Sequence, residues 1–424
     1  MPDRDRSGPG SGRLAGLNGR RALFWGAAFG PAAALLLPEI GGAYWALLVL
    51  AGALRAPAVW RRHGAALRAN PAWWTALALL AAYLLVAWST ALWLDASDFA
   101  LSRLRRTLLW LGAPLIFLLL LDLGPPRRAV YRALALNAVV FGLWAVAWWA
   151  WTDGERVRGV THAVHFGHAA LFLAVAPLAL WFERPGRPAA RWAGLALAGG
   201  LPAVLLSGSR GAWLAAAVVA VFLLALAVRR WGLSRRRIAA AAVLLLVALM
   251  GLAQLPVVER RLAETAAELE AVETGAWTTS LGWRLWMWRE AWALIRERPF
   301  TGAGFSSYYE RVRAHVRAGL LPEEMLDFAS EPHNDLLYHW VTRGLPGVLV
   351  YLLLLAWPAA QALRLLRGPP AAAGAGWALV CLVAVVALAG LTITVFDQRA
   401  VLRYLSWTAA GLGYALWTLR ARTP

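Results

Sequence analysis

A histidine at the end of a long polar segment is the strongest candidate for acid–base chemistry in this sequence. His333 stands in the segment SEPHNDLLYHW, where the chain enters another apolar run. An imidazole titrates near neutral pH, so it can take a proton from a hydroxyl group. Glu331 and Asn334 flank it and are candidates for a supporting role. The alternative is a simple helix start that Asn334 or Asp335 caps.

Arginines at the ends of apolar runs are the second group that could do chemistry. Arg210 lies in SGSRGAW, next to Ser209 and other small residues, at the junction of two apolar runs. Small residues would let a bulky anion approach the backbone, and the next helix would present its N-terminal N–H groups. Arg158 and Arg284 stand at comparable helix ends, and a guanidinium group grips phosphate through two parallel hydrogen bonds. The set predicts a site for a lipid-linked phosphate or pyrophosphate; the alternative for each arginine is pairing with an acidic residue or snorkelling to headgroups.

Three histidines follow one another at helical spacing. His162, His165 and His168 stand at positions i, i+3 and i+6 of one apolar run. A metal site would need a further ligand in fixed geometry, and the nearby Asp153 and Glu155 are not in helical register with the triplet. We therefore expect these histidines to line a polar cavity, with His165 in a supporting role, and we expect neither a metal nor a cofactor.

The elements that must position these residues are membrane-spanning helices. The chain has 424 residues, of which 60% are hydrophobic, and runs long enough to cross a bilayer recur from Ala22 to Trp417. The predicted fold class is an all-α polytopic membrane protein with about twelve transmembrane helices and a long periplasmic loop that contains amphipathic helices. The helices are expected near residues 22–37, 40–55, 72–93, 106–122, 133–151, 163–182, 191–207, 211–228, 238–256, 336–363, 374–395 and 402–418.

The distribution of basic residues predicts the orientation. All 42 basic residues are arginines, and most of them lie in alternate connections between the apolar runs. By the positive-inside rule these connections face the cytoplasm, which places both termini there in a bacterial inner membrane. Because arginine serves orientation first in such a protein, the net charge of +19 does not indicate nucleic-acid binding. The single Cys381 lies in an apolar run and excludes a disulfide framework.

Five segments result from this orientation. Residues 1–21 are expected to be a retained cytoplasmic tail, because no cleavage pattern follows them. The segments are the tail 1–21, transmembrane helices 1–9 at 22–256, a periplasmic loop at 257–335 with the candidate catalytic residues, transmembrane helices 10–12 at 336–418, and a second cytoplasmic tail at 419–424. In the loop, GWRLWMWREAWALIRERPF predicts an amphipathic helix that ends at Pro299 and suits a membrane interface.

Three motifs in this order resemble one known family. They are SGSRGAW (207–213), GWRLWMWREAWALIRERPFTGAGFSSYY (282–309) and EPHNDLLYHWVTRGLPGVLVYL (331–352). Together they look like the O-antigen ligase family of the WaaL type, which is grouped with the O-antigen polymerases and the bacterial protein O-oligosaccharyltransferases. The motif match covers about Arg158 to Leu352, and the remainder resembles the family by its helix count.

The resemblance implies a metal-independent, inverting glycosyltransferase of the GT-C type. Its donor would be O-antigen linked to undecaprenyl pyrophosphate, its acceptor the lipid A-core oligosaccharide, and it would work among membrane lipids with the active site facing the periplasm. Arg210 matches the family's S-x-S-R-G arginine, Arg284 its G-R-x-x-x-W arginine shifted by one tryptophan, and His333 its H-N-x-x-L histidine. Arg158 resembles a further basic residue before the sixth helix. These matches imply pyrophosphate binding by the three arginines and base catalysis by His333.

Several other functions remain open on this evidence. A sister enzyme, O-antigen polymerase or protein O-oligosaccharyltransferase, would use the same donor and similar arginines. The protein-glycosylating branch usually carries an additional C-terminal region, so a ligase or a polymerase is expected first. A transporter would predict discontinuous helices and two related halves. No internal repeat is present in the sequence, which disfavours transport, and a purely structural membrane protein is expected least.

The predicted orientation can be tested by cysteine accessibility. In a background with Cys381 replaced by alanine, Ser280→Cys should react with a membrane-impermeant maleimide in intact spheroplasts, because it lies in the expected outer loop. Ser234→Cys should react only after the membrane is opened, because it lies among cytoplasmic arginines. Labelling in the opposite order would invert the topology.

Overall fold

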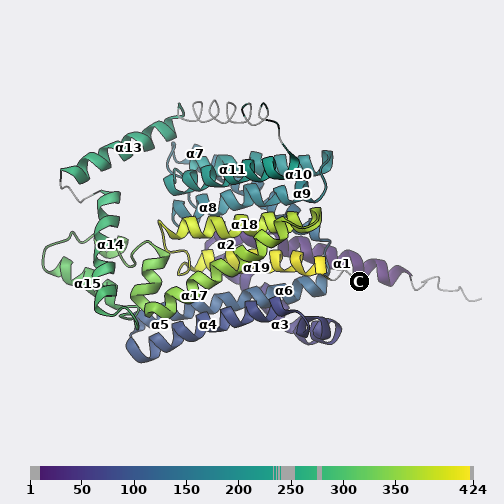
Figure 1. Cartoon of the computed structure of the whole chain (residues 1–424), viewed down its shortest axis with the longest axis horizontal. Helices are drawn as coiled ribbons and strands as arrows, with labels where there is room; N and C mark the ends of the chain where they lie inside the picture. Colours follow the sequence, from purple (N-terminus) through teal and green to yellow (C-terminus); the bar gives the residue numbers. More distant parts are fainter. Residues whose placement is uncertain are drawn as a thin grey trace, which may run out of the picture.

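The protein is a bundle of helices that run along one long axis (Figure 1). A computed structural model describes residues 10–232, 234, 236, 239, 254–274 and 279–420, and every regular element in these ranges is helical. In chain order the elements are α1 (Gly10–Ala28), α2 (Gly30–Leu36), α3 (Pro38–Arg68), α4 (Pro71–Leu94), α5 (Asp98–Thr107), η1 (Leu108–Leu111), α6 (Gly112–Leu123), α7 (Arg127–Trp151), α8 (Ala163–Val175), η2 (Ala176–Leu178), α9 (Ala179–Glu183), α10 (Arg187–Leu206), α11 (Arg210–Trp231), α13 (Pro256–Glu273), α14 (Ser280–Glu297), α15 (Ser307–Arg317), α16 (Met325–Phe328), α17 (Asp335–Leu366), α18 (Pro370–Gly390) and α19 (Arg399–Arg420).

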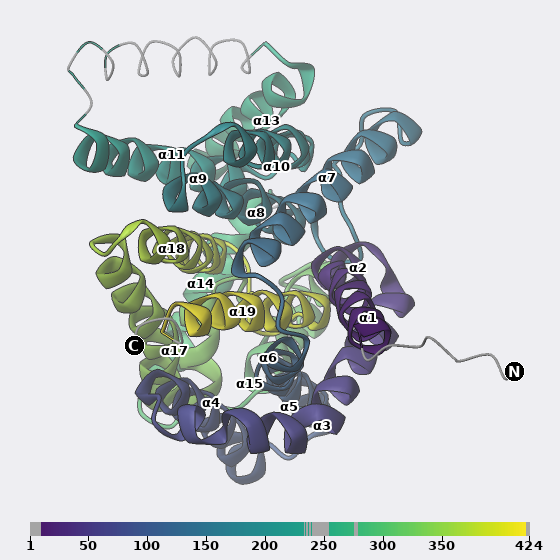
Figure 2. The same cartoon turned by 90° about the vertical axis from the view of Figure 1, so that its right-hand side faces the viewer.

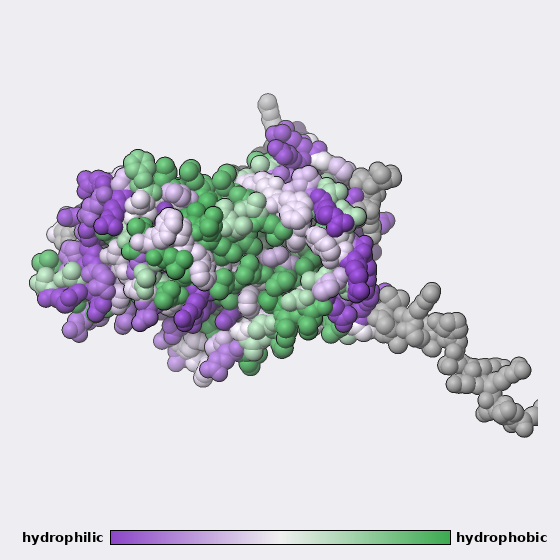
Figure 3. Space-filling model, turned by 90° about the horizontal axis from the view of Figure 1, so that it is seen from below, coloured by the Kyte–Doolittle hydropathy of each residue, from purple (hydrophilic) through white to green (hydrophobic). Residues whose placement is uncertain are grey.

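Nine helical segments in the described ranges are long and apolar enough to cross a membrane. They are Pro38–Arg68, Pro71–Leu94, Asp98–Leu123, Arg127–Trp151, Ala163–Glu183, Arg187–Leu206, Arg210–Arg230, Asp335–Leu366 and Pro370–Gly390. The space-filling view shows apolar side chains in a broad region between two polar ends (Figure 3). The prediction of an all-helical, multi-pass membrane protein is therefore confirmed.

The other three predicted spans have different outcomes. The helix expected at 238–256 lies almost entirely outside the described residues. The helix expected at 22–37 is divided between α1 and α2, which are separated at Phe29. The helix expected at 402–418 falls within α19, which is not among the nine apolar segments. The total of twelve therefore stays a prediction.

Helix α19 occupies the centre of the bundle, between α2, α6, α17 and α18 (Figure 2). Trp407 and the buried hydroxyl side chains of this helix face protein and find partners there. Trp407 donates from Nε1 to the carbonyl of Ala27 at 2.7 Å, and Ser406 donates to the carbonyl of Leu109 at 2.8 Å. Because these groups are satisfied inside the bundle, α19 does not need the apolar composition of a lipid-facing helix.

The prediction for the second helix was too short. The expected span 40–55 continues to Arg68 as part of α3, with Pro57 inside the helix. Arg55 and Arg62 lie about two helical turns apart on the same face of α3. Both pair with the buried Asp122 of α6, at 3.7 and 2.9 Å. The expected helix stopped at Arg55 because the carboxylate that holds both arginines is distant in the chain.

Helices α13 to α16 lie at one end of the bundle, which is called the loop end below (Figure 1). Helix α14 confirms the helix predicted before Pro299. Its apolar face contributes Met287 and Ala291 to a small hydrophobic core, which Val312 of α15 and Val341 of α17 complete. The loop end is therefore a packed unit attached to α17. Its placement at a membrane interface stays a prediction.

A sharp bend in α17 receives the segment that follows α14. Gly344 has φ 61° and ψ −157°, which interrupts the helix. The amide of Ala303 donates to the carbonyl of Val341 at 2.7 Å, and the amide of Leu345 donates to the carbonyl of Pro299 at 3.1 Å. A Cβ atom on Gly344 would lie 2.3 Å from the carbonyl oxygen of Phe300. Only glycine allows both this backbone conformation and this close approach.

Replacing this glycine should destabilise the protein. We expect Gly344→Ala to lower the melting temperature in detergent by several degrees, because alanine pays about 1–2 kcal/mol for positive φ and also meets the Phe300 carbonyl. Gly194→Ala in α10 is the matched control, since a Cβ there meets no atom within 4 Å. Equal melting temperatures for the two variants would contradict the importance of this contact.

Candidate functional site

A tight turn between α10 and α11 forms the floor of the candidate site. Ser209 caps α11, and its Oγ accepts a hydrogen bond from the amide of Ala212 at 3.2 Å. Gly208 adopts φ 57°, and the Ser207 hydroxyl donates to the carbonyl of Val204 at 2.6 Å. With these side chains engaged in the turn, the carbonyl oxygens of Ser207 and Gly208 remain available to cationic neighbours.

Two arginines from other parts of the chain use these carbonyls. Arg156, in the connection between α7 and α8, donates from Nε to the carbonyl of Ser207 at 3.2 Å. Arg261 of α13 donates from Nε to the carbonyl of Gly208 at 3.1 Å, and it also pairs with Glu264. A Cβ on Gly208 would lie 3.2 Å from the Arg156 side chain, so the small residue makes room for it. The sequence analysis did not select either arginine.

Arg210 reaches across to α13 from the first turn of α11. It donates from Nη1 to the Thr265 hydroxyl at 2.8 Å and from Nη2 to Glu268 at 3.0 Å, with the second carboxylate oxygen at 2.9 Å. About a quarter of the side chain is exposed (27%). The two terminal nitrogens of the guanidinium group are therefore occupied, Nη2 by a carboxylate and Nη1 by a hydroxyl.

Arg284 completes a group of four arginines. It donates from Nη1 to the Ser280 hydroxyl at 3.1 Å, and its buried Nε has no hydrogen-bond partner within the described residues. Burial lowers the pKa of Arg284, and the charge of Arg210 lowers it further. Burial likewise lowers the pKa of Arg156 to about 10, with the charge of Arg261 acting in the same direction. Clustered cations that depress one another's pKa favour an anionic ligand.

Arg158 lies apart from this group. Its side chain is exposed and stands over the ring of Trp148, 5.9 Å from the centroid. The neighbouring Val157 is buried, and its amide donates to the carbonyl of Leu206 at 3.0 Å, which fixes the register of this connection. The structure thus brings Arg156, and not Arg158, against the 207–210 turn. The sequence offers both arginines in one short loop, and only a contact distant in the chain distinguishes them.

His333 is held in an unusual backbone conformation, and its Nε2 makes no hydrogen bond to the residues that the structure describes. Its φ is 51°, and Nδ1–H donates to the carbonyl of Glu331 at 3.1 Å, which assigns the tautomer. The ring stacks on Phe328 with 4.9 Å between centroids. Burial lowers the pKa of His333 and so does the charge of Arg284, while the charge of Glu331 opposes them. The imidazole is neutral near pH 7, and Nε2 can accept a proton.

Glu331 and Asn334 hold the ends of the His333 loop. The buried Glu331 carboxylate accepts from Nη1 of Arg103 at 3.2 Å and from Nε2 of Gln398 at 3.4 Å. The Asn334 side chain caps α17 by accepting from the amide of Leu337 at 3.0 Å. It also donates to the carbonyl of Leu391 at 3.1 Å. Both side chains position the loop, and the contact of Glu331 with the imidazole is made by its backbone carbonyl.

The three histidines of the 162–168 triplet do not act as one group. His165 is buried in α8, where Nε2 contacts the carbonyl of Thr394 at 3.2 Å, and His168 contacts the carbonyl of Val164 at 2.7 Å. His162 caps α8, and burial with the charges of Arg156 and His333 lowers its pKa to about 4. Within the described ranges, no three histidine, cysteine or acidic side chains are placed to share a metal ion.

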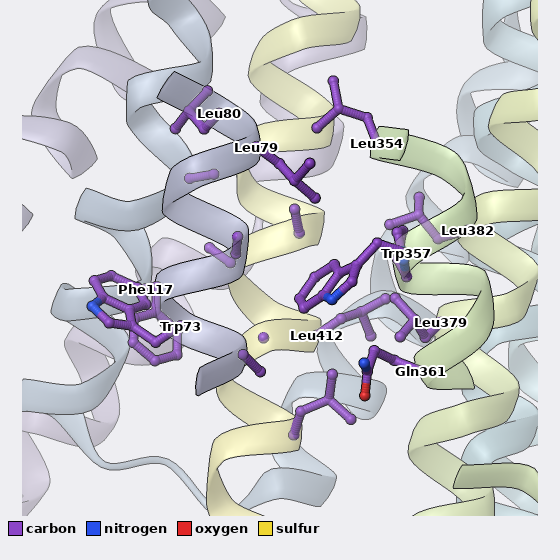
Figure 4. A pocket seen from close by; sticks show the side chains of 18 of the residues that line it. Trp73, Leu79, Leu80, Phe117, Leu354, Trp357, Gln361, Leu379, Leu382 and Leu412 are labelled. Atoms are coloured by element: carbon purple, nitrogen blue, oxygen red, sulfur yellow. The ribbon is translucent and has the colours of Figure 1, made fainter. Parts of the chain in front are cut away.

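A cavity of about 360 Å³ opens between α4, α6, α17, α18 and α19, away from these residues. Its walls are mostly apolar, as the view of Trp73, Leu79, Trp357 and Leu412 shows, with Gln361 among the few polar groups (Figure 4). None of the candidate site residues lines it. The cavity suits an apolar chain and carries no candidate for acid–base chemistry.

The contact between Arg210 and Glu268 predicts competition with an anion. We expect Glu268→Gln to bind inorganic pyrophosphate several-fold more tightly than the unchanged protein. The neutral amide no longer competes with the anion for the Arg210 guanidinium group and no longer repels it. Isothermal titration in detergent measures the affinity. Glu297→Gln is the control, since Glu297 pairs with Arg311 at the surface. Weaker binding by Glu268→Gln would show that the carboxylate orients the arginine for the anion.

Comparisons with known proteins agree with the three motifs. The model of a family described as O-antigen ligase matches residues 195–352, a range that includes Arg210, Arg284 and His333. A protein of Haemophilus influenzae (strain ATCC 51907 / DSM 11121 / KW20 / Rd), described as uncharacterized, is 26% identical over 238 residues, which cover 55% of this chain and 59% of the relative. The chain thus spans less than two thirds of that relative's length. The resemblance is confirmed for the matched segment: residues 195–352 of this chain match the model of the O-antigen ligase family.

Proposed function

We propose that this protein transfers a polysaccharide from undecaprenyl pyrophosphate to the lipid A-core oligosaccharide at the periplasmic face of the bacterial inner membrane. The single observation that carries the proposal is the meeting of four arginines from four elements near a histidine whose Nε2 makes no hydrogen bond within the described residues. The family match supports a glycosyltransferase-like activity. In this proposal the protein is an O-antigen ligase that inverts the anomeric carbon and needs no metal or cofactor.

The proposed donor site is the arginine group at the 207–210 turn. The pyrophosphate would displace Glu268 from Arg210 and lie between this fork and Arg284, with Arg156 and Arg261 held close by the carbonyls of the turn. Arg158 would contact the glycan or the phosphate from outside the group of four arginines. Guanidinium groups placed beforehand stabilise the negative charge that develops on the leaving pyrophosphate. Ser209 would support the site by fixing the start of α11.

The proposed chemical step uses His333 as a general base. Nε2 takes the proton of an acceptor sugar hydroxyl, and the oxygen attacks the anomeric carbon from the face opposite the leaving group. The bond between that carbon and the pyrophosphate oxygen breaks, and its electron pair stays on undecaprenyl pyrophosphate. Base catalysis of this kind contributes about 10²–10⁴ in rate. Glu331 and Asn334 support the step by holding the loop, and His165 supports it only through packing of α8.

The proposed topology places this chemistry outside the cytoplasm. With twelve crossings, the connections rich in arginine face the cytoplasm together with both termini, and the loop end faces the periplasm. Two lipid-borne substrates could then reach one site sideways through the membrane.

Deletion of the gene tests the function: a ligase deletion loses the whole lipopolysaccharide ladder and accumulates lipid-linked polymer. A core that bears one repeat would instead identify an O-antigen polymerase, and an unchanged ladder with loss of glycoproteins would identify a protein O-oligosaccharyltransferase.

Purified protein should separate base catalysis from donor binding. We expect His333→Ala to lose glycan transfer by at least about 10²-fold while it still binds the lipid-linked donor. Arg210→Lys should lose donor affinity, because a point charge cannot reproduce a two-pronged contact. Transfer is measured by gel shift of the acceptor with EDTA present, and His333→Ala activity within a few-fold of normal would refute the base assignment.

The pH profile provides a further readout of His333. Because its pKa is lowered, the neutral base form persists as the pH falls through 6.5, the ordinary histidine value. We therefore expect kcat/KM, which reports the free enzyme, to stay level across pH 6.5 and to fall only as the pH drops through the lowered pKa. A fall that begins above pH 6.5 would contradict this environment.

A further inference from the structure

A second group of arginines lies on α5 and at the start of α19, and part of it pairs with Glu331 next to the His333 loop. Arg399 and Arg403 stand one helical turn apart at the start of α19, and Arg103 and Arg106 lie on α5. The acidic partners in this region are Glu331 and Asp397, which pair with the two α5 arginines. The two carboxylates are thus taken by the arginines of α5, which leaves the positive charges of Arg399 and Arg403 uncompensated among the four arginines.

Neither Arg399 nor Arg403 has an acidic partner within the described part of the chain. Arg399 is exposed, and its charge repels those of Arg106 and Arg403. The buried Nε of Arg403 makes no hydrogen bond in that part of the chain. The carboxylate on the facing first turn of α3, Glu39, is exposed and forms no ion pair with either arginine among the described residues. Two neighbouring guanidinium groups with free donors are the usual recognition element for phosphate.

One of these guanidinium groups packs closely against the backbone of α3. Arg403 packs on Gly42 of α3, where an added Cβ would lie only 3.0–3.2 Å from the guanidinium atoms. The flanking surface is apolar: Ile40 of α3 is 63% exposed, and Leu108 and Leu111 of η1 are 37% and 40% exposed. A pair of cations beside exposed apolar side chains suits a molecule with an anionic headgroup and acyl chains.

The α19 pair is connected to the candidate site through the buried ion network. Gln398 directly precedes Arg399 and donates to the Glu331 carboxylate at 3.4 Å, and the backbone carbonyl of Glu331 holds His333. Arg106 donates to the carbonyl of Asp397 at 3.1 Å, which fixes the segment before α19. His333 is therefore influenced by the charge of Arg284 and is linked to the start of α19 through Glu331 and Gln398.

We propose that Arg399 and Arg403 bind a phosphate group on the acceptor glycolipid and thereby present its sugar hydroxyl to His333. The inference rests on the proposed function, and it assigns the two arginine groups to two substrates. The donor pyrophosphate takes the group at the 207–210 turn, and the acceptor phosphate takes the α19 pair. Repulsion between the two anions would keep the lipids in separate positions while the glycan passes between them.

Acceptor kinetics test this assignment. The full-length protein in nanodiscs is assayed with saturating donor and with two acceptors, a phosphorylated lipid A-core glycolipid and the same glycolipid after phosphatase treatment. The double variant Arg399→Gln/Arg403→Gln should raise KM for the phosphorylated acceptor about tenfold, the equivalent of one lost charge-assisted contact. The donor KM should not change. The unchanged protein should already show the raised KM with the dephosphorylated acceptor, and the double variant should add little to it.

Two controls make the result specific. Arg289→Gln on α14 removes an exposed arginine that belongs to neither group and should leave both KM values unchanged. Arg399→Gln alone changes an exposed side chain and should show part of the effect even if the double variant is unstable. A rise in KM that is equal for both acceptors, or a rise in the donor KM instead, would overturn the assignment.

Direct binding separates this inference from the proposed function. The affinity of each glycolipid for the protein is measured without donor, so it does not depend on transfer. If no transfer occurs but the phosphorylated glycolipid binds more tightly to the unchanged protein than to the double variant, the proposed function fails and the phosphate site stands. Equal binding of both glycolipids to both proteins would refute the site, whatever the transfer assay shows.

Discussion

Repulsion between arginine side chains is the constraint on which the loop end of this protein depends. Four guanidinium groups meet there, and burial makes their charges act strongly on one another. They are Arg156, Arg210, Arg261 and Arg284. The arrangement holds because each guanidinium group contacts an oxygen. The carbonyls of Ser207 and Gly208 bind Arg156 and Arg261, carboxylates on α13 bind Arg210 and Arg261, and the Ser280 hydroxyl binds Arg284. The turn between α10 and α11 and helix α13 are therefore parts of one electrostatic unit, although a long stretch of sequence separates them.

A second electrostatic unit fixes the histidine. The buried Glu331 is bound to Arg103 of α5 and to Gln398 before α19, so the chain must turn sharply at His333 to enter α17. A positive φ at a residue other than glycine costs free energy, and it persists where surrounding contacts determine the backbone. Buried ion pairs of this kind contribute little net stability, but they define position. Here they leave Nε2 unengaged and hold Nδ1 against a carbonyl.

The backbone of the loop end is joined to the membrane bundle at a few close contacts. The bend at Gly344 receives the turn after α14, and the small core around Met287 and Val341 attaches α14 and α15 to α17. Because α17 also begins directly after His333, movement of the outer helices and the position of the histidine are mechanically connected. The apolar cavity between α4 and α17 lies elsewhere in the bundle and is separate from both arginine groups.

The sequence by itself determined the class of the fold and indicated the family. Apolar runs of bilayer length require helices, because backbone groups in hydrocarbon must bond internally, and the predicted multi-pass helical protein followed from that. The motifs around Arg210, Arg284 and His333 also indicated the family, since they are local patterns. Prediction was weakest for α3, whose arginines were taken for a loop because Asp122 is distant in the chain.

Only the tertiary structure decided which charged groups meet. Arg156 and Arg158 are equivalent in sequence, and the hydrogen bond from Val157 to Leu206 selects the first for the 207–210 turn. Local sequence patterns likewise did not predict the partner of Arg210 on α13 or the burial of the polar helix α19. The physical reason is that periodicity reports which face of a helix is apolar, whereas pairing between charges depends on contacts across the whole chain.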